Sequence, residues 1–332
     1  MMEQSEIEAL QRWVGRTQSV DDRAVPGPLA GLASLLDHSI PPWISGEMPP
    51  LAHWLYFLPR ERQSLLDTDG HPKRGDFLPP VPLPRRMWVG SRVHFVVPIA
   101  VDAAISRRST IETVTAKSGR SGSMVFVTVK HEITAHGTLA LIEEQDIVYR
   151  AAPPASSPQS APHAGAQALR PATRIAQEPP RPQTAAGPGP AEPAGSAERP
   201  QSAKVSQSAE APLRPRVSQM TRTIIPDPVQ LFRFSALTFN AHRIHYDVDY
   251  ARDVEGYPGL VVHGPLVATL LMDHFLRHAG GRAVRSFHFR AERPLFDTAP
   301  FDLCLAPTAT GGDLWAIDAN GATAFTAAVE VA

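Results

Sequence analysis

Cysteine is nearly absent from this chain of 332 residues, which contains a single one, Cys304. One cysteine excludes an intramolecular disulfide framework and an all-cysteine metal site, and it suits a reducing compartment. Apolar runs of membrane-spanning length are also absent, and the acidic amino terminus lacks the basic, apolar and small-residue order of a secretory signal. We therefore expect a cytoplasmic protein with no membrane partner, in which Cys304 is a small buried hydrophobic residue.

An excess of either charge is missing too. The 32 Lys and Arg residues balance the 33 Asp and Glu residues, so the formal net charge is -1 at pH 7. This balance gives no reason to expect a nucleic-acid partner. The length and the 43% content of hydrophobic residues are sufficient for two domain-sized cores.

Aromatic residues are missing from residues 151–215, although this stretch holds 14 of the 34 prolines. Ala, Pro, Ser and Gln dominate it, so it cannot form a core, and we predict a disordered, partly polyproline linker. The prediction divides the chain into an amino-terminal domain of residues 1–150, the linker of residues 151–215 and a carboxy-terminal domain of residues 216–332.

The first predicted domain begins with helices and continues with strands. Helices are predicted near residues 5–14 and 28–38, residues 51–58 form a strand or a buried connection, and residues 59–84 form a long loop. Strand-like runs follow at residues 92–99, 108–116, 124–135 and 139–149.

The second predicted domain repeats this order. A short strand at residues 221–225 precedes a helix that Asp227 caps and Pro228 starts. Another helix starts at Gly264 and ends before Gly280. Strand-like runs follow at residues 284–294, 301–307, 313–317 and 323–331. Helices followed by antiparallel strands in both halves indicate an α+β protein with two copies of one fold.

Residues 234–264 concentrate groups that transfer protons beside glycines. They include three histidines, an amide and two acids, namely His242, His245, His263, Asn240, Asp247 and Asp249. Histidine titrates near neutral pH and glycine lets a substrate approach the backbone, so the stretch is predicted to form an active-site loop. The alternative is that these residues only cap helices and satisfy a buried loop.

His242 and His245 also have the His-x-x-His spacing of a zinc site, with His263 as a third ligand. Neither a cysteine nor a second nearby histidine pair supports such a site. We therefore predict neither a metal nor a cofactor.

Residues 240–264 resemble the MaoC-like, or (R)-specific, enoyl-CoA hydratases of the hot-dog fold. The signature of that family is Asp, any residue, Asn, Pro, any residue, His, with a His-Gly pair further along at the start of the central helix. In this register Asn240 stands at the Asp, and the other signature positions are occupied by His242, Arg243, His245, His263 and Gly264.

Residues 235–240 and 242–247 are closer still to two-domain hydratases that resemble mesaconyl-C4-CoA (3-methylfumaryl-CoA) and itaconyl-CoA hydratases. In that subgroup the first half is a degenerate hot-dog domain, similar to residues 117–122 and 127–129 here. The resemblance implies a double hot-dog fold with a degenerate first copy, two sheets joined edge to edge, and an acyl-CoA thioester as substrate. A homodimer of the two-domain chain is the assembly that we consider.

The resemblance implies a hydratase, a carbon-oxygen lyase that adds water across the double bond of an unsaturated acyl-CoA. Such a reaction needs a base for water, a proton donor for the α-carbon and N–H groups facing the thioester oxygen. His245 can serve as the base, and the amide of Gly264, at the positive end of a helix, as the oxyanion donor. The acyl pocket is expected between the central helix, which starts at Gly264, and the loop that carries the three histidines.

Asn240 departs from the family signature because an amide has no titratable proton. Losing one acid/base group typically costs about 10² to 10⁴ in rate. In one account His242, Asp247 or Asp249 replaces the acid. In a second, which we favour, Asn240 positions the water while His245 cycles the proton, so that Asn240 and His245 are the catalytic residues. In a third, this half is not catalytic.

The remaining site residues are expected to bind substrate, namely His242, Arg243, His263, Gly264 and Arg290. Arg243 or Arg290 could pair with a carboxylate of a C4 or C5 dicarboxylic thioester such as mesaconyl-CoA, or either could face solvent or the CoA phosphates. Other functions that suit the fold are a thioesterase, a dehydratase of acyl-carrier-protein thioesters and a non-catalytic acyl-thioester-binding protein.

Overall fold

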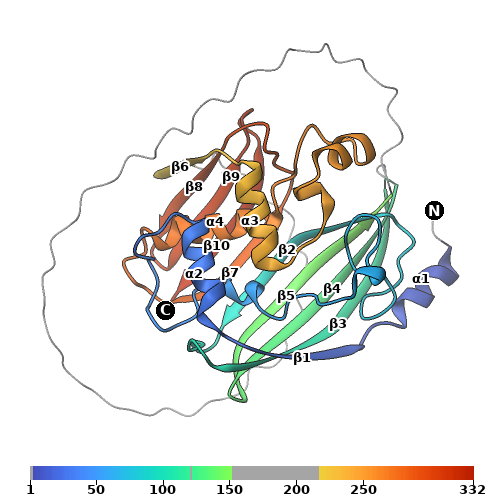
Figure 1. Ribbon diagram of the computed structural model, residues 1–332, viewed down its shortest axis with the longest axis horizontal. Helices are drawn as coiled ribbons and strands as arrows, with labels where there is room; N and C mark the ends of the chain where they lie inside the picture. Colours follow the sequence, from blue (N-terminus) through green and yellow to red (C-terminus); the bar gives the residue numbers. More distant parts are fainter. Residues whose placement is uncertain (1–2, 120–121, 152–216) are drawn as a thin grey trace, which may run out of the picture. The chain divides into compact units, whose positions relative to one another are not determined.

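The computed structural model describes residues 3–119, 122–151 and 217–332 (Figure 1). Residues 1–152 and 216–332 belong to one compact unit. Apart from its first residue, Ala151, the predicted linker lies outside the described residues. The division of the remainder into domains of residues 1–150 and 216–332 stays a prediction.

One antiparallel sheet of ten strands runs through both halves, in the order β1-β3-β4-β5-β2-β7-β10-β9-β8-β6 (Figure 1). The first half supplies β1 (Thr17–Arg23), β2 (Arg85–Phe95), β3 (Ala104–Gly119), β4 (Gly122–Ala135) and β5 (Thr138–Arg150). The second half supplies β6 (Met220–Ile224), β7 (Val284–Ala291), β8 (Phe301–Thr308), β9 (Gly311–Ile317) and β10 (Thr323–Val331).

The strand order outwards from the middle of the sheet is the same in both halves. It runs β2-β5-β4-β3-β1 in one direction and β7-β10-β9-β8-β6 in the other. β2 and β7 join the halves as an antiparallel pair that extends from Gly90 opposite Arg290 to His94 opposite Ser286. The predicted repeat of one fold and the predicted edge-to-edge joining of the sheets are therefore confirmed.

The helices are α1 (Gln4–Gln11), α2 (Pro26–Leu35), α3 (Pro228–Thr238) and α4 (Gly264–Leu276), with the short turns η1 (Ala52–Leu55), η2 (Gln63–Leu65), η3 (Arg243–His245) and η4 (Tyr250–Val254). α2 follows β1 as α3 follows β6, and the two helices pack on each other. Among the described residues of the first half, only η1 and η2 lie between α2 and β2, where the second half has α4. The first copy is therefore degenerate, as predicted.

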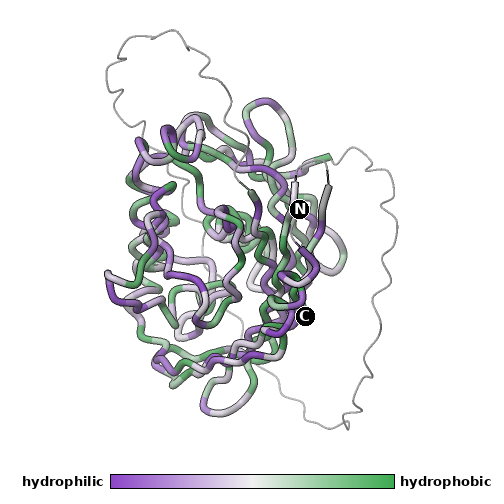
Figure 2. The backbone as a smooth tube through the Cα atoms, turned by 90° about the vertical axis from the view of Figure 1, so that its right-hand side faces the viewer, coloured by the Kyte–Doolittle hydropathy of each residue, from purple (hydrophilic) through white to green (hydrophobic). Residues whose placement is uncertain are grey.

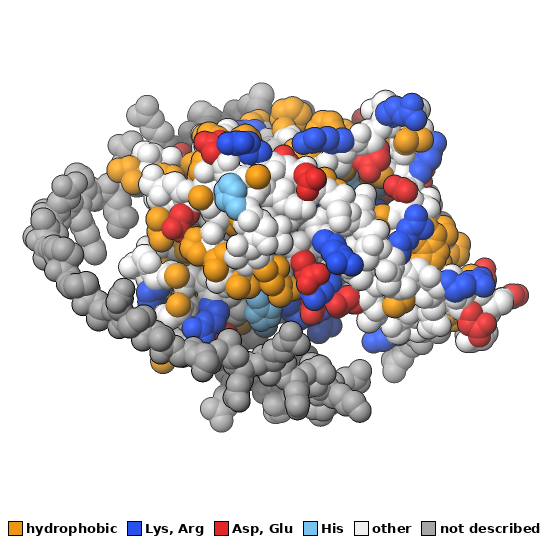
Figure 3. All heavy atoms as spheres, turned by 90° about the horizontal axis from the view of Figure 1, so that it is seen from below, with side chains coloured by type: hydrophobic (Ala, Val, Ile, Leu, Met, Phe, Trp, Pro, Cys, Tyr) orange, Lys and Arg blue, Asp and Glu red, His pale blue; other side chains and the backbone are white. Residues whose placement is uncertain are grey.

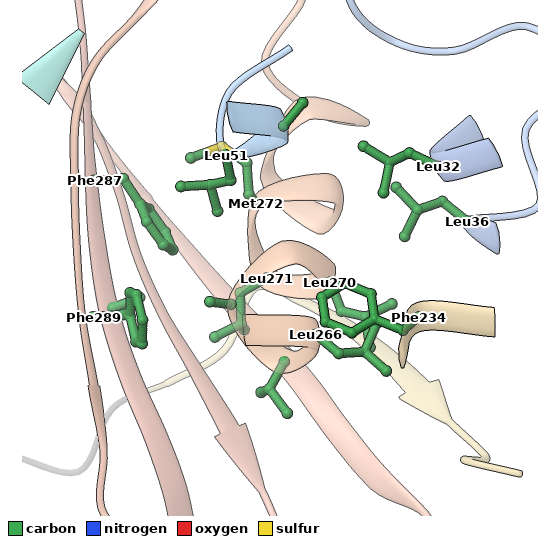
Figure 4. Packing of buried hydrophobic residues seen from close by; sticks show 14 of the residues in the cluster. Leu32, Leu36, Leu51, Phe234, Leu266, Leu270, Leu271, Met272, Phe287 and Phe289 are labelled. Carbon is green, nitrogen blue, oxygen red and sulfur yellow. The ribbon is translucent and has the colours of Figure 1, made fainter. Parts of the chain in front are cut away.

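α4 is the central helix of the second copy and is buried on every side along residues 266–275. Figure 4 shows Leu271 facing Phe289 of β7, and Leu270 lying towards Phe234 of α3. A helix that is buried on all sides belongs inside a core, which agrees with the place of α4 between the sheet and α3.

β1 is the one strand that the sequence pattern did not predict, because most of its residues are polar and exposed. It pairs with β3 at the edge of the sheet. The inner strands give the expected signal: in β4 the side chains of Val125, Val127 and Val129 are buried and their neighbours less so. Hydrophobic and hydrophilic stretches are interspersed along the described chain in Figure 2.

The surface charge and the burial of Cys304 agree with the predictions from composition. Basic and acidic side chains are interspersed on the face shown in Figure 3. Cys304, in β8, is buried as predicted, with 2% of its surface exposed. None of the helices in the described part of the chain is long and apolar enough to cross a bilayer.

A buried ionic cluster ties the end of α4 to its neighbours. Asp273 lies 2.6 Å from Nε2 of His38, 2.7 Å from Nη1 of Arg222 and 2.9 Å from Nε of Arg277. Burial alone would raise the pKa of Asp273, but the hydrogen bond to His38 and the charge of Arg277 hold it below its usual value. α4, β6 and the segment after α2 therefore share one carboxylate.

Replacing Asp273 by alanine is expected to lower the free energy of unfolding by about 3 to 5 kcal/mol, because it removes the buried carboxylate that His38 and two partly buried arginines, Arg222 and Arg277, share. Urea denaturation measures the change. Asp313→Ala, at an exposed position of β9, is the matched control and should change stability by less than about 0.5 kcal/mol. Equal, small effects of both substitutions would contradict a structural role for the cluster.

Candidate active site

The histidine loop, residues 240–263, begins where α3 ends. Asp227 caps the start of α3, because its Oδ1 accepts hydrogen bonds from the N–H groups of Val229 (2.8 Å) and Gln230 (3.1 Å). From the end of α3 the chain passes through η3 and η4 to α4. This path brings His245 and His263 against each other.

His245 is buried, with 7% of its surface exposed. Its Nδ1 lies 2.7 Å from the carbonyl oxygen of Val261, which can only accept, so Nδ1 carries the proton and Nε2 keeps a lone pair. Burial lowers the pKa of His245 to about 4, although the hydrogen bond to Val261 acts in the opposite direction. The imidazole is therefore neutral near pH 7, and Nε2 can accept a proton from water.

His263 stacks on His245 at the start of α4. The ring centroids are 3.6 Å apart and the planes differ by 18°. Nε2 of His263 lies 2.8 Å from Oγ of Ser235, and burial and the neighbouring His245 lower the pKa of His263 well below its usual value. Gly264 is the first residue of α4, so its N–H has no acceptor within the helix and lies at the positive end of the helix dipole.

Asn240 shapes the histidine loop. Its Oδ1 accepts the N–H of His242 at 3.0 Å, and its own N–H donates to the carbonyl of Ser235 at 2.8 Å. The side-chain oxygen is therefore bonded to the backbone, and Nδ2 is the remaining side-chain donor. The catalytic role of Asn240 stays a prediction.

The two acids considered as replacements for Asn240 are used within the loop itself. Oδ1 of Asp247 accepts the N–H of Tyr250 at 3.0 Å, and its Oδ2 accepts from Arg243 at 2.7 and 3.0 Å. The side chain of Asp249 is 77% exposed and pairs with Arg252 at 2.8 Å. An exposed or arginine-bound carboxylate is a poor proton donor near neutral pH.

The two arginines predicted to bind a substrate carboxylate lie in different surroundings, and their substrate-binding role stays a prediction. The guanidinium of Arg243 pairs with Asp247 and lies over the ring of Tyr250, 4.2 Å from its centroid. Arg290 is exposed on β7 and follows the buried Phe289, so its side chain lies on the face of the sheet away from α4. The structure therefore does not bring Arg290 together with the histidines.

Two residues that the sequence analysis missed come from the amino-terminal half, in the predicted loop of residues 59–84. Oδ2 of Asp69 lies 2.9 Å from Nδ1 of His71, and Oδ1 accepts the N–H of His71 at 2.8 Å. The ring centroid of His71 lies 4.0 Å from that of His242, which in turn lies 5.4 Å from that of His245. Three imidazoles thus form a continuous series of contacts.

Burial keeps these histidines neutral. Burial, together with the charge of Arg86, lowers the pKa of His71 to about 4, and burial with the neighbouring His71 lowers the pKa of His242 to about 2. Burial by itself would raise the pKa of Asp69, but the hydrogen bond to His71 holds it below its usual range. At neutral pH Asp69 is a carboxylate that accepts the Nδ1–H of His71, and Nε2 of His71 keeps its lone pair.

Gly70 allows the two loops to approach. Its φ is +91°, and a Cβ there would lie 1.8 Å from the carbonyl oxygen of Ala241. The N–H of Arg243 donates to the carbonyl of Asp69 at 2.9 Å, and its Nη1 to that of Thr68 at 3.3 Å. The sequence signal was the Asp-Gly-His run itself, but no local pattern indicates which distant segment it contacts.

One potential metal-ligand atom from each of Asp69, His71 and His242 lies within 4.8 Å of the other two, a spacing that could also hold a cation. The hydrogen bond between Asp69 and His71 places a proton between two of those atoms instead. The histidine trio whose spacing was considered for zinc, His242, His245 and His263, differs. Within it Nδ1 of His245 is bonded to the carbonyl oxygen of Val261, and Nε2 of His263 lies 2.8 Å from Oγ of Ser235.

A cavity of about 510 Å³ lies near the other end of α4. Its lining includes Trp43, Met48, Phe95, Leu141 and Leu276, and none of the predicted site residues. This cavity is therefore not the acyl pocket expected between α4 and the histidine loop.

Comparison with known proteins places these features in a family. The sequence profile of hydroxyacyl-thioester dehydratase type 2 matches residues 51–179 and 196–297. The chain belongs to the hydroxyacyl-thioester dehydratase type 2 family. One relative is the mesaconyl-C(4)-CoA hydratase of Chloroflexus aurantiacus, 45% identical over 320 residues that cover 96% of each chain. The mitochondrial hydroxyacyl-thioester dehydratase type 2 of Schizosaccharomyces pombe is 37% identical over 101 residues, 30% of this chain and 33% of the relative.

Several solved structures are similar in fold to this chain. HtdX of Mycobacterium tuberculosis matches with a TM-score of 0.57 and 15% identity, covering 96% of this chain and all 100% of the other. A MaoC-like dehydratase of Phytophthora capsici matches with a TM-score of 0.59 and 13% identity over 98% of both. A double hot-dog protein of M. tuberculosis matches with a TM-score of 0.51 and 14% identity over 96% of both. The predicted family resemblance and the predicted α+β double hot-dog fold are confirmed.

Proposed function

We propose that the chain is an acyl-CoA hydratase, a carbon-oxygen lyase that adds water across the double bond of an unsaturated acyl-CoA and can run in reverse as a dehydratase. The observation that carries the proposal is His245, a buried neutral imidazole with a lone pair on Nε2, beside the N-terminus of α4. The relative that shares 45% identity and is named mesaconyl-C(4)-CoA hydratase supports the reaction type.

The residues of the histidine loop fit the steps of this reaction. Nε2 of His245 takes a proton from water as the water oxygen attacks the β-carbon. Negative charge then develops on the thioester oxygen, and the N–H of Gly264, at the positive end of α4, donates to it. His263 stacks on His245 and holds its ring against Val261, which keeps Nε2 in a fixed orientation.

We propose mesaconyl-C4-CoA (3-methylfumaryl-CoA) or itaconyl-CoA as substrate and citramalyl-CoA as product. Such a substrate carries a carboxylate besides the thioester. Arg243 and Arg290 were predicted to bind it, but Arg243 is already paired with Asp247 and Arg290 lies on the other face of the sheet. We propose Arg86 of β2 for this role: it lies opposite Tyr149 in the β2–β5 ladder, and its charge contributes to lowering the pKa of both His71 and His242.

The setting of the reaction is part of the proposal. We place the protein in the cytoplasm, as one chain or as a homodimer, with no nucleic-acid or membrane partner. The balanced charge and the single cysteine support this setting.

A panel of thioesters tests the substrate. Absorbance of the conjugated enoyl-thioester is followed with mesaconyl-C4-CoA and crotonyl-CoA, and the gain of one water is followed by product mass with itaconyl-CoA. The dicarboxylic thioesters should be hydrated with a kcat/KM at least about 10-fold higher than crotonyl-CoA, because a buried carboxylate pairing is worth more than 1.4 kcal/mol. Equal or better hydration of crotonyl-CoA would contradict the dicarboxylic substrate.

The pH dependence of kcat/KM follows from the lowered pKa of His245. A base acts only when deprotonated, and its pKa of about 4 means that protonation begins only as the pH falls towards 4. We expect kcat/KM to stay within about 2-fold between pH 5.5 and 8, where an unperturbed histidine of pKa about 6.5 would give a roughly 10-fold fall. Steady-state rates across that range measure it, and a half-maximum near pH 6.5 would contradict a buried neutral base.

A further inference from the structure

We propose that the Asp69–His71 pair of the amino-terminal half is the second proton-transfer group of the site, with His71 as the catalytic residue at the α-carbon and Asp69 as the residue that positions it. The inference rests on the proposed hydratase function and names the group that Asn240 cannot supply. It also gives the first half a direct part in the chemistry.

The hydrogen bonds at His71 match those of an oriented base. Asp69 binds the ring through Nδ1 at 2.9 Å and the backbone of His71 through its other oxygen at 2.8 Å. A carboxylate that accepts Nδ1–H fixes the tautomer and leaves the Nε2 lone pair for proton transfer. About 19% of the side chain of His71 and 20% of that of Asp69 stay exposed, so the pair lies at the border of the site rather than in the core.

The position of the pair is fixed by contacts between the two halves. Gly70 lies against the carbonyl of Ala241 so closely that no side chain fits, and the backbone of Arg243 is bonded to the carbonyl of Asp69. His71 therefore sits beside the same turn that carries His242 and His245. A solvated surface loop would not need a glycine at this contact.

The reaction balances without any further reactant. In the dehydration direction, Nε2 of His71 removes a proton from the α-carbon, and the C–H electron pair forms an enolate whose oxygen accepts from Gly264. The proton passes by way of His242 and bridging water to His245, because the rings contact one another without direct N–H···N hydrogen bonds. His245 gives it to the β-hydroxyl as the C–O bond breaks and the enolate electrons form the C=C bond, so water leaves and all three histidines end neutral. Hydration is the exact reverse of these steps, with the proton travelling from water to the α-carbon.

Isotope exchange separates this account from one in which His245 alone cycles the proton. Citramalyl-CoA is incubated in deuterated water with the full chain, and α-carbon deuterium is measured by mass spectrometry beside enoyl formation. His71→Asn is expected to lower both exchange and elimination by about 10² to 10⁴-fold. His245→Ala and His242→Ala are expected to lower elimination while exchange stays within about 10-fold of the wild type, because His71 still forms the enolate.

Asp69 has its own test as a positioning residue. Asp69→Asn should lower kcat by about 10-fold or more with little change in KM, and Asp69→Glu should recover part of the loss. His94→Gln, at an exposed histidine of β2 outside the site, is the matched control for the histidine variants and should retain wild-type rates. Thermal unfolding of each variant confirms that it is folded.

Three results would overturn the inference. The first is His71→Asn with wild-type exchange and elimination, and the second is loss of exchange in His245→Ala to the same extent as elimination. The third is loss of activity on treatment with a chelator and its recovery with zinc, which would make Asp69, His71 and His242 a metal site. A wild-type chain that hydrates none of the thioesters would instead overturn the proposed function, and the inference with it.

Discussion

His245→Ala is expected to lower kcat for hydration by about 10³-fold, within the range of about 10² to 10⁴ that a general base contributes. The substitution removes the Nε2 lone pair beside the N-terminus of α4, while Gly264 and the substrate contacts remain. KM should change by less than about 3-fold, because the lost interaction is made chiefly in the transition state. Initial rates at saturating thioester measure kcat directly.

His136→Asn is the control for His245→Ala. His136 is exposed between β4 and β5 with a φ of +47°, a conformation that asparagine tolerates. The His136→Asn variant should leave kcat unchanged. A His245→Ala protein that retains more than about a tenth of the wild-type kcat would remove His245 from the role of base.

Gly70→Ala is expected to lower kcat by about 10²-fold, because the new Cβ would lie 1.8 Å from the carbonyl oxygen of Ala241 and must push the loop of residues 67–71 away from the histidine loop. Displacement by even about 1 Å separates His71 from His242. Rates and thermal unfolding are measured together, so that lost geometry can be distinguished from lost stability.

Gly75→Ala provides a matched control, because it carries the same backbone strain without the collision. Gly75 has a φ of +99°, and a Cβ there would meet only the Cβ of Pro80, at 3.7 Å. Both alanine variants should lose about 1 to 2 kcal/mol of stability from the positive φ, and Gly70→Ala should lose more because of the collision with Ala241. Only Gly70→Ala should lose activity, and an equal loss of activity in both would contradict the proposed contact between the loops.

Much of the fold could be predicted because the relevant signals are local. The cap at Asp227, the glycine before Pro265 and the alternating pattern of β4 each act within a few residues, and each agrees with the structure. β1 was missed because an edge strand with polar residues lacks an alternating apolar pattern. The sequence indicates a strand or a buried connection at residues 51–58, and the structure has the turn η1 there.

The candidate site was predicted only in its carboxy-terminal part. His245, His263 and Gly264 come together because one continuous segment carries them. Asp69 and His71 meet that segment through contacts between residues far apart in the chain, which periodicity and spacing cannot reveal. Arg290 was predicted to bind substrate because an arginine can pair with a carboxylate. The alternation of side chains along β7 places it on the opposite face of the sheet.

The retention of a degenerate first copy has a physical explanation in this arrangement. Its strand β2 completes the continuous sheet through β7, and the backbone of Trp88 on β2 lies 3.7 Å from the point where a Cβ on Gly264 would be. Its loop of residues 67–71 contacts the histidine loop from the other side. The first half thus borders the site at both the helix N-terminus and the histidines.

The most direct test of the account is turnover of mesaconyl-C4-CoA by the wild-type chain, with enoyl absorbance, free thiol and product mass recorded in one reaction. We predict that the enoyl absorbance disappears, that no thiol is released and that the product gains the mass of one water. Release of free CoA would instead indicate a thioesterase, and thioester binding without any turnover would indicate a binding protein; either result would contradict the hydratase.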